Sequence, residues 1–441
     1  MNNTVYKVHF TTLGCSKNDI DTEVMISLLD TEQYILVDDI HDADISIINT
    51  CSFILDAKKQ SIEAIFEIAQ LKKTTLKYLI IAGCLAQRYP RELKDDIPEI
   101  DTILGTGQVG FINQILRETT YNGGGVFVSG VNNPHNETAK RVDFSKTQYV
   151  KISEGCNNHC TYCIIPKLRG RMRSRKIEHI LDEVRFLVSR GTREIILIAQ
   201  NTTEYGKDIY GEPSLHKLLD TLDQIPDVKW IRVLYMYPEG FYDELIETFA
   251  HAKKLIPYVD MPLQHVSDSV LETMGRKSTK KSIIDLIEQL RNALPNIIIR
   301  STFIVGFASE TEKDFQELLD FLSVYKLDRV GVFCYSLEEG TRAYKWGSPV
   351  DEMIKEQRKA DLMELQAKIS FDKLERRVGT KMECLIEEKV EDGLYVGRSY
   401  MDAPGIDGQV YVHSKNDLTI GEFYDIMVLS HDDYDLVAEK V

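Results

Sequence analysis

Short apolar segments alternate with helical patterns along the first part of the chain. Three of these segments, at residues 7–14, 45–50 and 78–83, are partly β-branched and end directly before a cysteine. Between them lie stretches with the apolar spacing of a helix, such as residues 61–71. Strands that alternate with helices form parallel sheets, so we expect an N-terminal α/β domain built on a parallel sheet.

The same alternation recurs from residue 148 onward. Strand-like runs occupy residues 149–152, 194–199, 230–236, 257–261, 297–305 and 329–335. Helical patterns such as residues 177–188 and 281–294 separate them. Six strand–helix repeats predict an open, partial (β/α)6 barrel of the TIM type, with its functional site at the carboxyl ends of the strands.

The pattern changes again near the C-terminus. Residues 351–377 predict one long amphipathic helix, and the short strands with glycine turns from residue 381 predict a small all-β barrel. A glycine-rich and polar stretch follows the first domain and resembles a linker. We therefore expect an α/β protein with an N-terminal domain over residues 1–122, a linker over 123–142, a partial barrel over 143–373 and a β-barrel over 376–441.

Composition is consistent with several packed domains and a cytoplasmic location. The chain has 441 residues, of which 43% are hydrophobic, enough for two or three cores. It has no apolar run that would span a bilayer and begins without the apolar stretch of a signal peptide, so we expect no membrane partner. Eight cysteines in a cytoplasmic chain are expected to be metal ligands or free thiols. The net charge of −16 disfavours loose adsorption to nucleic acid.

The densest candidate chemistry is a C-x3-C-x2-C cassette formed by Cys156, Cys160 and Cys163. It offers three thiolates and no fourth, which suits a 4Fe–4S cluster that keeps one iron open to another ligand. An open coordination position is typical of reactive metal sites. The alternative is a zinc knuckle or a chance cluster, but zinc sites normally have a second pair of ligands downstream, and none follows here.

Cys15, Cys51 and Cys84 each follow one of the three apolar segments of the N-terminal domain. The carboxyl ends of parallel strands meet at one edge of a sheet, so we expect these thiols to converge. Converging thiols suit a second 4Fe–4S cluster with an open iron; the alternative is three core cysteines without a ligand, since free cysteine is often buried. Cys334 and Cys384 have no partners at ligand spacing, and we expect both to be core residues.

The cassette, with the aromatic Tyr162 before its last cysteine, resembles that of the radical S-adenosylmethionine (SAM) enzymes. Together with the second cysteine set, nearly the whole chain resembles the methylthiotransferases of that superfamily. The resemblance rests on residues 12–18, 49–58, 82–88, 156–170, 262–265, 303–307 and 335–341. It implies two 4Fe–4S clusters, one on each cysteine set, and an external electron donor. It also implies two roles for SAM, as methyl donor and as the source of a 5′-deoxyadenosyl radical made at the cassette cluster.

Residues near the expected strand ends are candidates for SAM contact. They are Tyr162, Gln200, Asn201, His265, Arg300 and Gly306. The alternative for the polar members is simple capping of the barrel mouth, whereas Gly306 allows close approach of an adenine ring. The basic run Arg169, Arg171, Arg173, Arg175 and Lys176 is either a clamp near the SAM carboxylate or the cluster, or a solvated loop.

The C-terminal barrel helps to choose the substrate. Its position resembles that of a TRAM domain, and residues 381–441 hold five Lys and Arg against fourteen Asp and Glu, a net charge of −9. Such a barrel repels phosphates and attracts a basic protein, unless its acids serve only solubility.

Residues 402–408 also resemble the branch that methylthiolates the β-carbon of an aspartate in ribosomal protein S12. We therefore expect that protein, free or on the small subunit, as the partner. One alternative is methylthiolation of an adenosine in tRNA, which the negative charge makes an unlikely partner. The other is a non-catalytic iron–sulfur protein.

Overall fold

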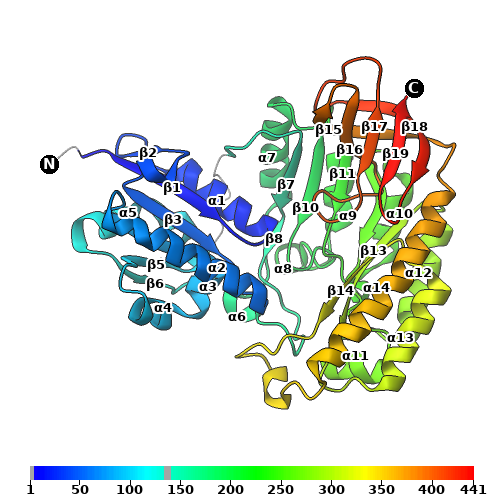
Figure 1. The fold of residues 1–441 in the computed structure, drawn as a ribbon, viewed down its shortest axis with the longest axis horizontal. Coiled ribbons are helices and arrows are strands. Elements are labelled where there is room, and N and C mark those ends of the chain that lie inside the picture. Colours follow the sequence, from blue (N-terminus) through cyan, green and yellow to red (C-terminus); the bar gives the residue numbers. More distant parts are fainter. Residues whose placement is uncertain (1–3, 134–140) are drawn as a thin grey trace.

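The computed structural model describes residues 4–133 and 141–441, which form an N-terminal α/β unit, a central partial barrel and a small C-terminal β-barrel (Figure 1). The three kinds of unit and their order confirm the predicted fold class. Residues 134–140, which belong to the predicted linker, lie outside the described residues. None of the described helices is long and apolar enough to cross a membrane.

The N-terminal unit is a six-stranded, fully parallel sheet with the strand order β2-β1-β3-β4-β5-β6. Its strands are β1 Tyr6–Thr12, β2 Tyr34–Leu36, β3 Ile45–Thr50, β4 Tyr78–Ala82, β5 Thr102–Leu104 and β6 Gly125–Phe127. Its helices are α1 Ser16–Leu28, α2 Leu55–Ala69, α3 Gly83–Arg88, α4 Pro90–Asp96 and α5 Ile112–Asn122. Successive side chains of β3 point to opposite faces, so Ile47 packs with Ile80 and Ile48 with Ile81. Helices bury both faces, which explains why β3 is buried at every position.

One strand of this sheet was not expected. Strand β6 pairs in parallel with β5 and lies within the range predicted to be a linker. The strand is only three residues long and contains a glycine, so its sequence carries little periodic signal. The first sheet therefore extends a few residues beyond the last helix of the unit.

The central unit contains six parallel strands in the order β14-β13-β12-β11-β10-β7, which is the chain order. The strands are β7 Thr147–Lys151, β10 Glu194–Ile198, β11 Trp230–Val233, β12 Leu255–Asp260, β13 Ile298–Val305 and β14 Arg329–Cys334. The helices are α6 Ile165–Arg169, α7 Ile177–Ser189, α8 Lys207–Tyr210, α9 Leu215–Asp223, α10 Asp243–His251, α11 Asp268–Met274, α12 Lys280–Ala293, α13 Glu312–Tyr325 and α14 Glu352–Glu375. A short antiparallel pair, β8 Ser153–Glu154 and β9 Arg173–Ser174, flanks the cysteine cassette. The chain-order sheet is the open, partial barrel that the six repeats predict.

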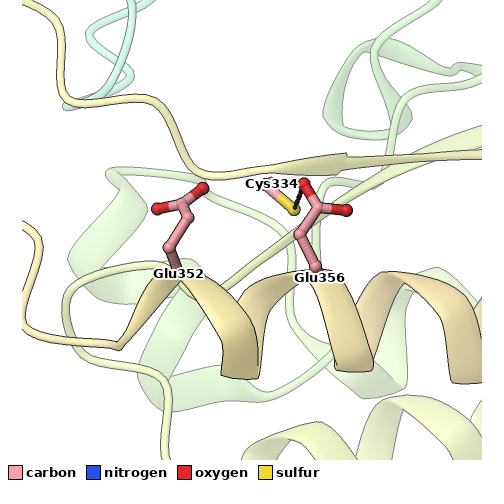
Figure 2. Close-up of side chains that lie close together, drawn as sticks. All are labelled: Cys334, Glu352 and Glu356. Atoms are coloured by element: carbon pink, nitrogen blue, oxygen red, sulfur yellow. Dashed lines mark hydrogen bonds between the residues drawn. The ribbon is translucent and has the colours of Figure 1, made fainter.

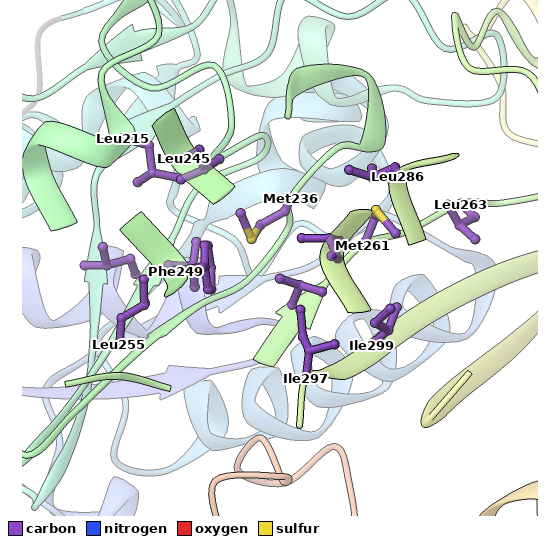
Figure 3. Packing of buried hydrophobic residues seen from close by; sticks show 14 of the residues in the cluster. Leu215, Met236, Leu245, Phe249, Leu255, Met261, Leu263, Leu286, Ile297 and Ile299 are labelled. Atoms are coloured by element: carbon purple, nitrogen blue, oxygen red, sulfur yellow. The ribbon is translucent and has the colours of Figure 1, made fainter. Parts of the chain in front are cut away.

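The main core of the molecule lies between this sheet and the helices outside it. Figure 3 shows Leu255 and Ile299 from the strands beside Leu215, Phe249 and Leu286 from helices α9, α10 and α12. All five side chains are buried. The alternating strand residues that face this core hold the sheet in register, because a slip of one residue would turn them away from the helices.

The C-terminal unit is a closed five-stranded barrel with the order β15-β16-β17-β19-β18. Its strands are β15 Lys381–Glu391, β16 Leu394–Arg398, β17 Val410–His413, β18 Phe423–His431 and β19 Leu436–Lys440, and α14 connects it to the central unit. Arg398 donates to Glu194 at 2.6 Å, and Arg329 pairs with Asp402. Glu194 and Arg329 begin strands β10 and β14, so the C-terminal barrel covers the amino ends of those strands. The C-terminal barrel therefore leaves the carboxyl ends of these strands uncovered, on the side of the sheet where the cysteine cassette lies.

These contacts correct one part of the sequence interpretation. Asp402 and Asp407 were counted among the charges that attract a basic partner, but both are structural. Asp402 is 1% exposed, and Asp407 accepts a hydrogen bond from the Tyr258 hydroxyl at 2.6 Å. Paired and largely buried carboxylates add little to the field outside the protein, so any attraction must come from the exposed acids of the barrel.

Candidate functional site

The first cysteine set lies at one edge of the N-terminal sheet. Cys15 is the N-cap of α1 after β1, Cys51 follows β3, and Cys84 lies in the first turn of α3 after β4. Strands β1, β3 and β4 are neighbours, so the chain brings the three cysteines together. Gly14 makes this possible, because its φ is +103° and a Cβ there would lie 2.6 Å from the Cβ of Cys51.

The chemistry of these thiols fits a cationic or metallic ligand. Burial raises the pKa of Cys84 to about 11 and also raises the pKa of Cys51, and neighbouring thiols of the set act in the same direction. A thiolate in this place therefore needs a positive partner to offset the cost of burial. None of the cysteines in the described ranges forms a disulfide. The set thus offers three soft ligands without a fourth, as an iron–sulfur cluster with an open iron requires.

The second set lies in the loop between β8 and α6. The backbone N–H of Asn158 donates to the Cys156 sulfur at 3.4 Å, and the N–H of Cys156 donates to the Gly170 carbonyl at 3.1 Å. The N–H of Cys163 donates to the Cys160 carbonyl at 3.2 Å, which keeps the loop compact. Burial raises the pKa of Cys156 to about 11 and that of Cys163 to about 12. The same argument for a metallic ligand therefore applies to this set.

The two cysteine sets are neighbours across the boundary between two units. Cys84 packs in a buried cluster with Ile164 and Leu168, and Ile164 directly follows Cys163. Helix α3 of the N-terminal unit lies against helix α6 of the central unit. The structure therefore joins two thiol sites that are far apart in the sequence.

Two of the residues predicted to contact SAM lie beside the second set, Tyr162 within the cassette and Gln200 next to it. Gln200 donates to Glu154, the residue two positions before Cys156. The carbonyl oxygen of Gln200, the hydroxyl of Tyr162 and Nε2 of His265 are buried and have no hydrogen-bond partner among the described residues. Buried polar atoms are normally paired, so these atoms suit a polar ligand such as SAM.

Other predicted contacts are already engaged. Asn201 is buried and accepts a hydrogen bond from the Thr203 hydroxyl at 2.7 Å. Burial lowers the pKa of His265 to about 4, so its ring is neutral near pH 7. Gly306 has a φ of +72°, and a Cβ there would lie 2.3 Å from Cγ of Lys355. A lysine stem therefore occupies the side of Gly306 where a side chain would lie.

Arg300 does not lie at the carboxyl end of its strand, as the sequence interpretation assumed. It is the third residue of β13, and its guanidinium donates to Asp260 at 2.7 Å and lies 3.3 Å from Asp407. The predicted run 297–305 matches the observed strand Ile298–Val305, so Arg300 already lay near the amino end of that run. The structure therefore assigns Arg300 to the contact with the C-terminal barrel.

The basic run divides in two. Arg169 and Arg175 are buried, whereas Arg171 and Lys176 are exposed and Arg173 is half-buried. The solvated-loop interpretation fits the exposed pair. Arg175 pairs with Glu183 at 2.6 Å, whereas Arg169 lies beside Cys84, so the clamp interpretation fits Arg169.

Sequence reasoning missed a group beside Cys160. A cavity there is lined by Asn158, Tyr237, Glu239 and Arg276, and the Tyr237 hydroxyl lies 3.9 Å from the Cys160 sulfur. The Arg276 guanidinium donates to Glu239 at 2.9 Å. Tyr237 and Glu239 follow β11, and Arg276 follows α11, in short segments where no periodic pattern marks them.

Cys334 was expected in the core, but it is only half-buried, and its thiol donates to Glu356 at 3.4 Å (Figure 2). With Glu352 these residues form the only group of three such ligands in the described ranges whose ligand atoms lie within 4.8 Å of one another. Lys355 already pairs with Glu352 at 2.8 Å, and both glutamates are exposed, so the group has no need of a metal ion. Cys384 is fully buried in the C-terminal barrel, as expected.

In neither cysteine set do all three sulfur atoms lie within 4.8 Å of one another. A cluster of four irons and four sulfides is wider than a single ion, so this spacing is compatible with the predicted clusters.

Three family models match the chain. They are described as the uncharacterized protein family UPF0004 over residues 7–105, the Radical SAM superfamily over residues 150–322 and the TRAM domain over residues 378–441. The first covers the first cysteine set and the second covers the cassette.

Curated relatives match over nearly the whole length. A protein of Clostridium botulinum (strain Eklund 17B / Type B) named ribosomal protein uS12 methylthiotransferase RimO is 47% identical, with 99% of this chain and 98% of the relative covered. A protein of the same name from Clostridioides difficile (strain 630) is 45% identical, with 98% of each covered.

Solved structures show the same fold at low identity. The radical SAM methyltransferase TsrM from Kitasatospora setae, solved with cobalamin and a [4Fe-4S] cluster, matches with a TM-score of 0.55 and 15% identity over 75% of each chain. The cobalamin-dependent radical SAM enzyme OxsB matches with a TM-score of 0.53 and 13% identity over 82% of this chain and 56% of OxsB.

Proposed function

Because the chain belongs to the RimO family of ribosomal protein uS12 methylthiotransferases, we propose that it attaches a methylthio group to uS12. The acceptor is the β-carbon of an aspartate, and the enzyme acts in the cytoplasm, on uS12 that is free or on the small subunit. The observation that carries the proposal is the packing of Cys84 against Ile164, which places one three-thiol set beside the other. An electron carrier has no need of two adjacent sites with three thiols each.

We assign one 4Fe–4S cluster to Cys156, Cys160 and Cys163 and a second to Cys15, Cys51 and Cys84. When bound, the clusters and SAM supply the radical and the methylthio group, and an external donor supplies electrons. The chain supplies the rest. Four of the six thiols are buried, those of Cys51, Cys84, Cys156 and Cys160, which limits the access of water and oxidants to them.

The residues around the cassette give the SAM site its shape. Gln200 is oriented by its bond to Glu154, so its free carbonyl oxygen is available to accept a hydrogen bond from an amino group. The rings of Tyr162 and Phe307 are nearly perpendicular, at 6.3 Å between ring centroids, and the buried Tyr162 hydroxyl lies beside the Arg276 guanidinium. Asn201 lines the cavity beside Cys160, and we propose that it forms the polar lining of the SAM site together with Gln200 and Tyr162. A fixed lining lets SAM bind in one orientation without rearrangement.

The C-terminal barrel supports a protein substrate over tRNA. Its exposed acids include Glu388, Glu391, Asp392, Asp425, Asp433 and Glu439. Ribosomal proteins are basic, whereas the phosphates of tRNA carry the same sign of charge as this surface. Complementary charge raises the rate of encounter and disfavours the wrong partner.

The test is a reaction with purified components. The protein is reconstituted anaerobically with iron and sulfide and then incubated with SAM, a reductant and either uS12 or bulk tRNA. Mass spectrometry should find a methylthio group on one aspartate of uS12 and none on the tRNA. A modified adenosine with unmodified uS12 would refute the protein substrate.

The cysteine assignment has its own test. The triple variant Cys156→Ala, Cys160→Ala, Cys163→Ala should keep about half of the iron and lose SAM cleavage, because one of two clusters is removed. The matched triple variant at Cys15, Cys51 and Cys84 should still produce 5′-deoxyadenosine but transfer no methylthio group. Full iron in either variant would contradict the assignment.

A further inference from the structure

Arg169 belongs to the central unit, but its side chain reaches into the N-terminal unit. It is the last residue of α6 and is 2% exposed. One guanidinium nitrogen donates to the Asn18 side-chain oxygen at 2.6 Å, and the other donates to Asp21 at 2.9 Å. Both acceptors lie on α1, the helix that Cys15 caps.

Asn18 connects this arginine to the loops that carry two of the cysteines. Its side-chain nitrogen donates to the Leu13 carbonyl at 2.7 Å and to the Thr50 carbonyl at 3.1 Å. Leu13 lies two residues before Cys15, and Thr50 directly precedes Cys51. Arg169 thus holds the amide that ties two strand ends of the first set together.

The third cysteine of the set, Cys84, packs against Leu168, which directly precedes Arg169. Burial raises the pKa of Cys84, whereas the positive charge and a hydrogen bond of Arg169 act to lower it. The pKa of Cys51 is affected in the same direction by Arg169. All three cysteines therefore lie within the reach of one cation, which acts directly or through Asn18.

The charges behind Arg169 are balanced without the cysteines. Arg169 donates to Glu154 at 3.0 Å, and Lys151 pairs with both Glu154, at 2.8 Å, and Asp21. Two cations thus face two carboxylates in a buried network. Any negative charge on the first cysteine set is additional to this network, and Arg169 is the cation of the network that adjoins the set.

The same turn also supports the second set. Gly170, next to Arg169, has a φ of +74°, and its carbonyl accepts the hydrogen bond from the N–H of Cys156. Two consecutive residues therefore serve the two sets, Gly170 through its backbone carbonyl and Arg169 through its side chain.

We propose that Arg169 is a positioning residue for the cluster held by Cys15, Cys51 and Cys84, supplied to that cluster across the boundary between two units. This inference rests on the proposed function, which assigns a cluster to that set. The reduction potential of an iron–sulfur cluster depends on nearby charge and on hydrogen bonds to its sulfur atoms. A fixed positive charge stabilises the more negative, reduced form, so Arg169 raises the potential of this cluster. Arginine suits the role because it stays protonated and donates along several directions at once.

The test uses the full chain with Cys156, Cys160 and Cys163 changed to Ala, so that only the first set can hold a cluster. Iron and sulfide are added anaerobically, and the midpoint potential is measured by a titration followed with electron paramagnetic resonance. Arg169→Gln should shift the midpoint to a more negative potential. Arg169→Lys keeps the charge and should stay close to the parent.

A second variant guards against a failure to fold. Arg169→Gln leaves two buried carboxylates facing one lysine, whereas Asp21→Asn combined with Arg169→Gln restores the balance of that network. The double variant should load iron like the parent and should still show the lower potential, because it still lacks the cation that acts on Cys84.

Three different results would contradict, respectively, the role of Arg169, the charge argument and the assignment of the first cysteine set. An unchanged midpoint in Arg169→Gln and in the double variant overturns the inference about Arg169. An equal shift in Arg169→Lys and Arg169→Gln overturns the charge argument. A parent that binds no cluster at all overturns the assignment of the first cysteine set, and with it the proposed function on which the inference rests.

Discussion

Glu338 is expected to hold the N-terminal unit against the central unit. It lies in the loop after β14, and one carboxylate oxygen accepts hydrogen bonds from Lys58 at 2.8 Å and Arg88 at 2.7 Å. Both cations belong to the N-terminal unit. Arg88 also donates to the carbonyl of Ser52, next to Cys51, at 2.8 Å. Glu338→Gln therefore removes the charge that connects a central loop to the edge of the first cysteine set.

The size of the effect follows from burial. The side chains of Glu338 and Arg88 are each 5% exposed, and that of Lys58 is 14% exposed. Removing one partner of a buried ion pair costs about 3–5 kcal/mol, because the remaining charge is left buried without compensation. A glutamine still accepts one hydrogen bond, so we expect the lower end, about 3 kcal/mol. At about 1.4 kcal/mol per factor of ten, the ratio of docked to undocked protein should fall about 100-fold.

Hydrogen exchange measures this docking directly. Amide protons of α3 lie in the interface with α6, and their exchange through local opening reports the free energy of that opening. Exchange there should become faster by up to the same factor in Glu338→Gln. The neighbouring Glu339 is exposed and offers a matched control, since losing an exposed pair costs less than about 1 kcal/mol.

A functional readout follows from the same reasoning. Under the proposed assignment of the clusters, SAM cleavage needs only the central unit, whereas methylthio transfer needs both units. Glu338→Gln should therefore lower the amount of methylthiolated uS12 per 5′-deoxyadenosine formed, and Glu339→Gln should not. Equal exchange and equal yield in the two variants would show that Glu338 does not control the docking of the units.

Two further predictions concern the C-terminal barrel. Burial alone raises the pKa of Glu194, but its two arginine partners outweigh burial and hold the pKa below its ordinary value of 4.5. The stabilising effect of the Glu194 carboxylate is therefore fully present above pH 4.5 and is lost as the pH falls through the pKa of the folded protein. Trp230 contacts Phe423 of the C-terminal barrel, so its fluorescence should report the separation of this barrel from the central unit in acid. In Glu194→Gln the barrel should separate more easily already at pH 7. Reversing the exposed Glu388 and Glu391 to Lys should weaken association with uS12, and added salt should weaken the parent similarly, because exposed charges are screened within about 10 Å at 0.1 M ionic strength. If neither the charge reversal nor the added salt changes the affinity for uS12, the acids of the C-terminal barrel serve only solubility.

Local patterns in the sequence determined much of this protein. The β-branched runs predicted the strands, since burial on both faces of a parallel sheet demands apolar residues at nearly every position. The spacing of Cys156, Cys160 and Cys163 within eight residues was visible without any structure. The convergence of Cys15, Cys51 and Cys84 followed from a rule of topology, because the ends of parallel strands share one edge.

Only the tertiary structure decided which charged residues support the site. Arg169 and Asp21 are 148 positions apart, and Glu338 and Arg88 are 250 apart, so no local period connects them. Arg300 and Asp407 resembled functional charges in the sequence, yet they pair with each other between two units. The physical reason is that hydrophobic periodicity reports whether a position is buried, whereas the partner of a buried charge depends on how separately folded units pack together.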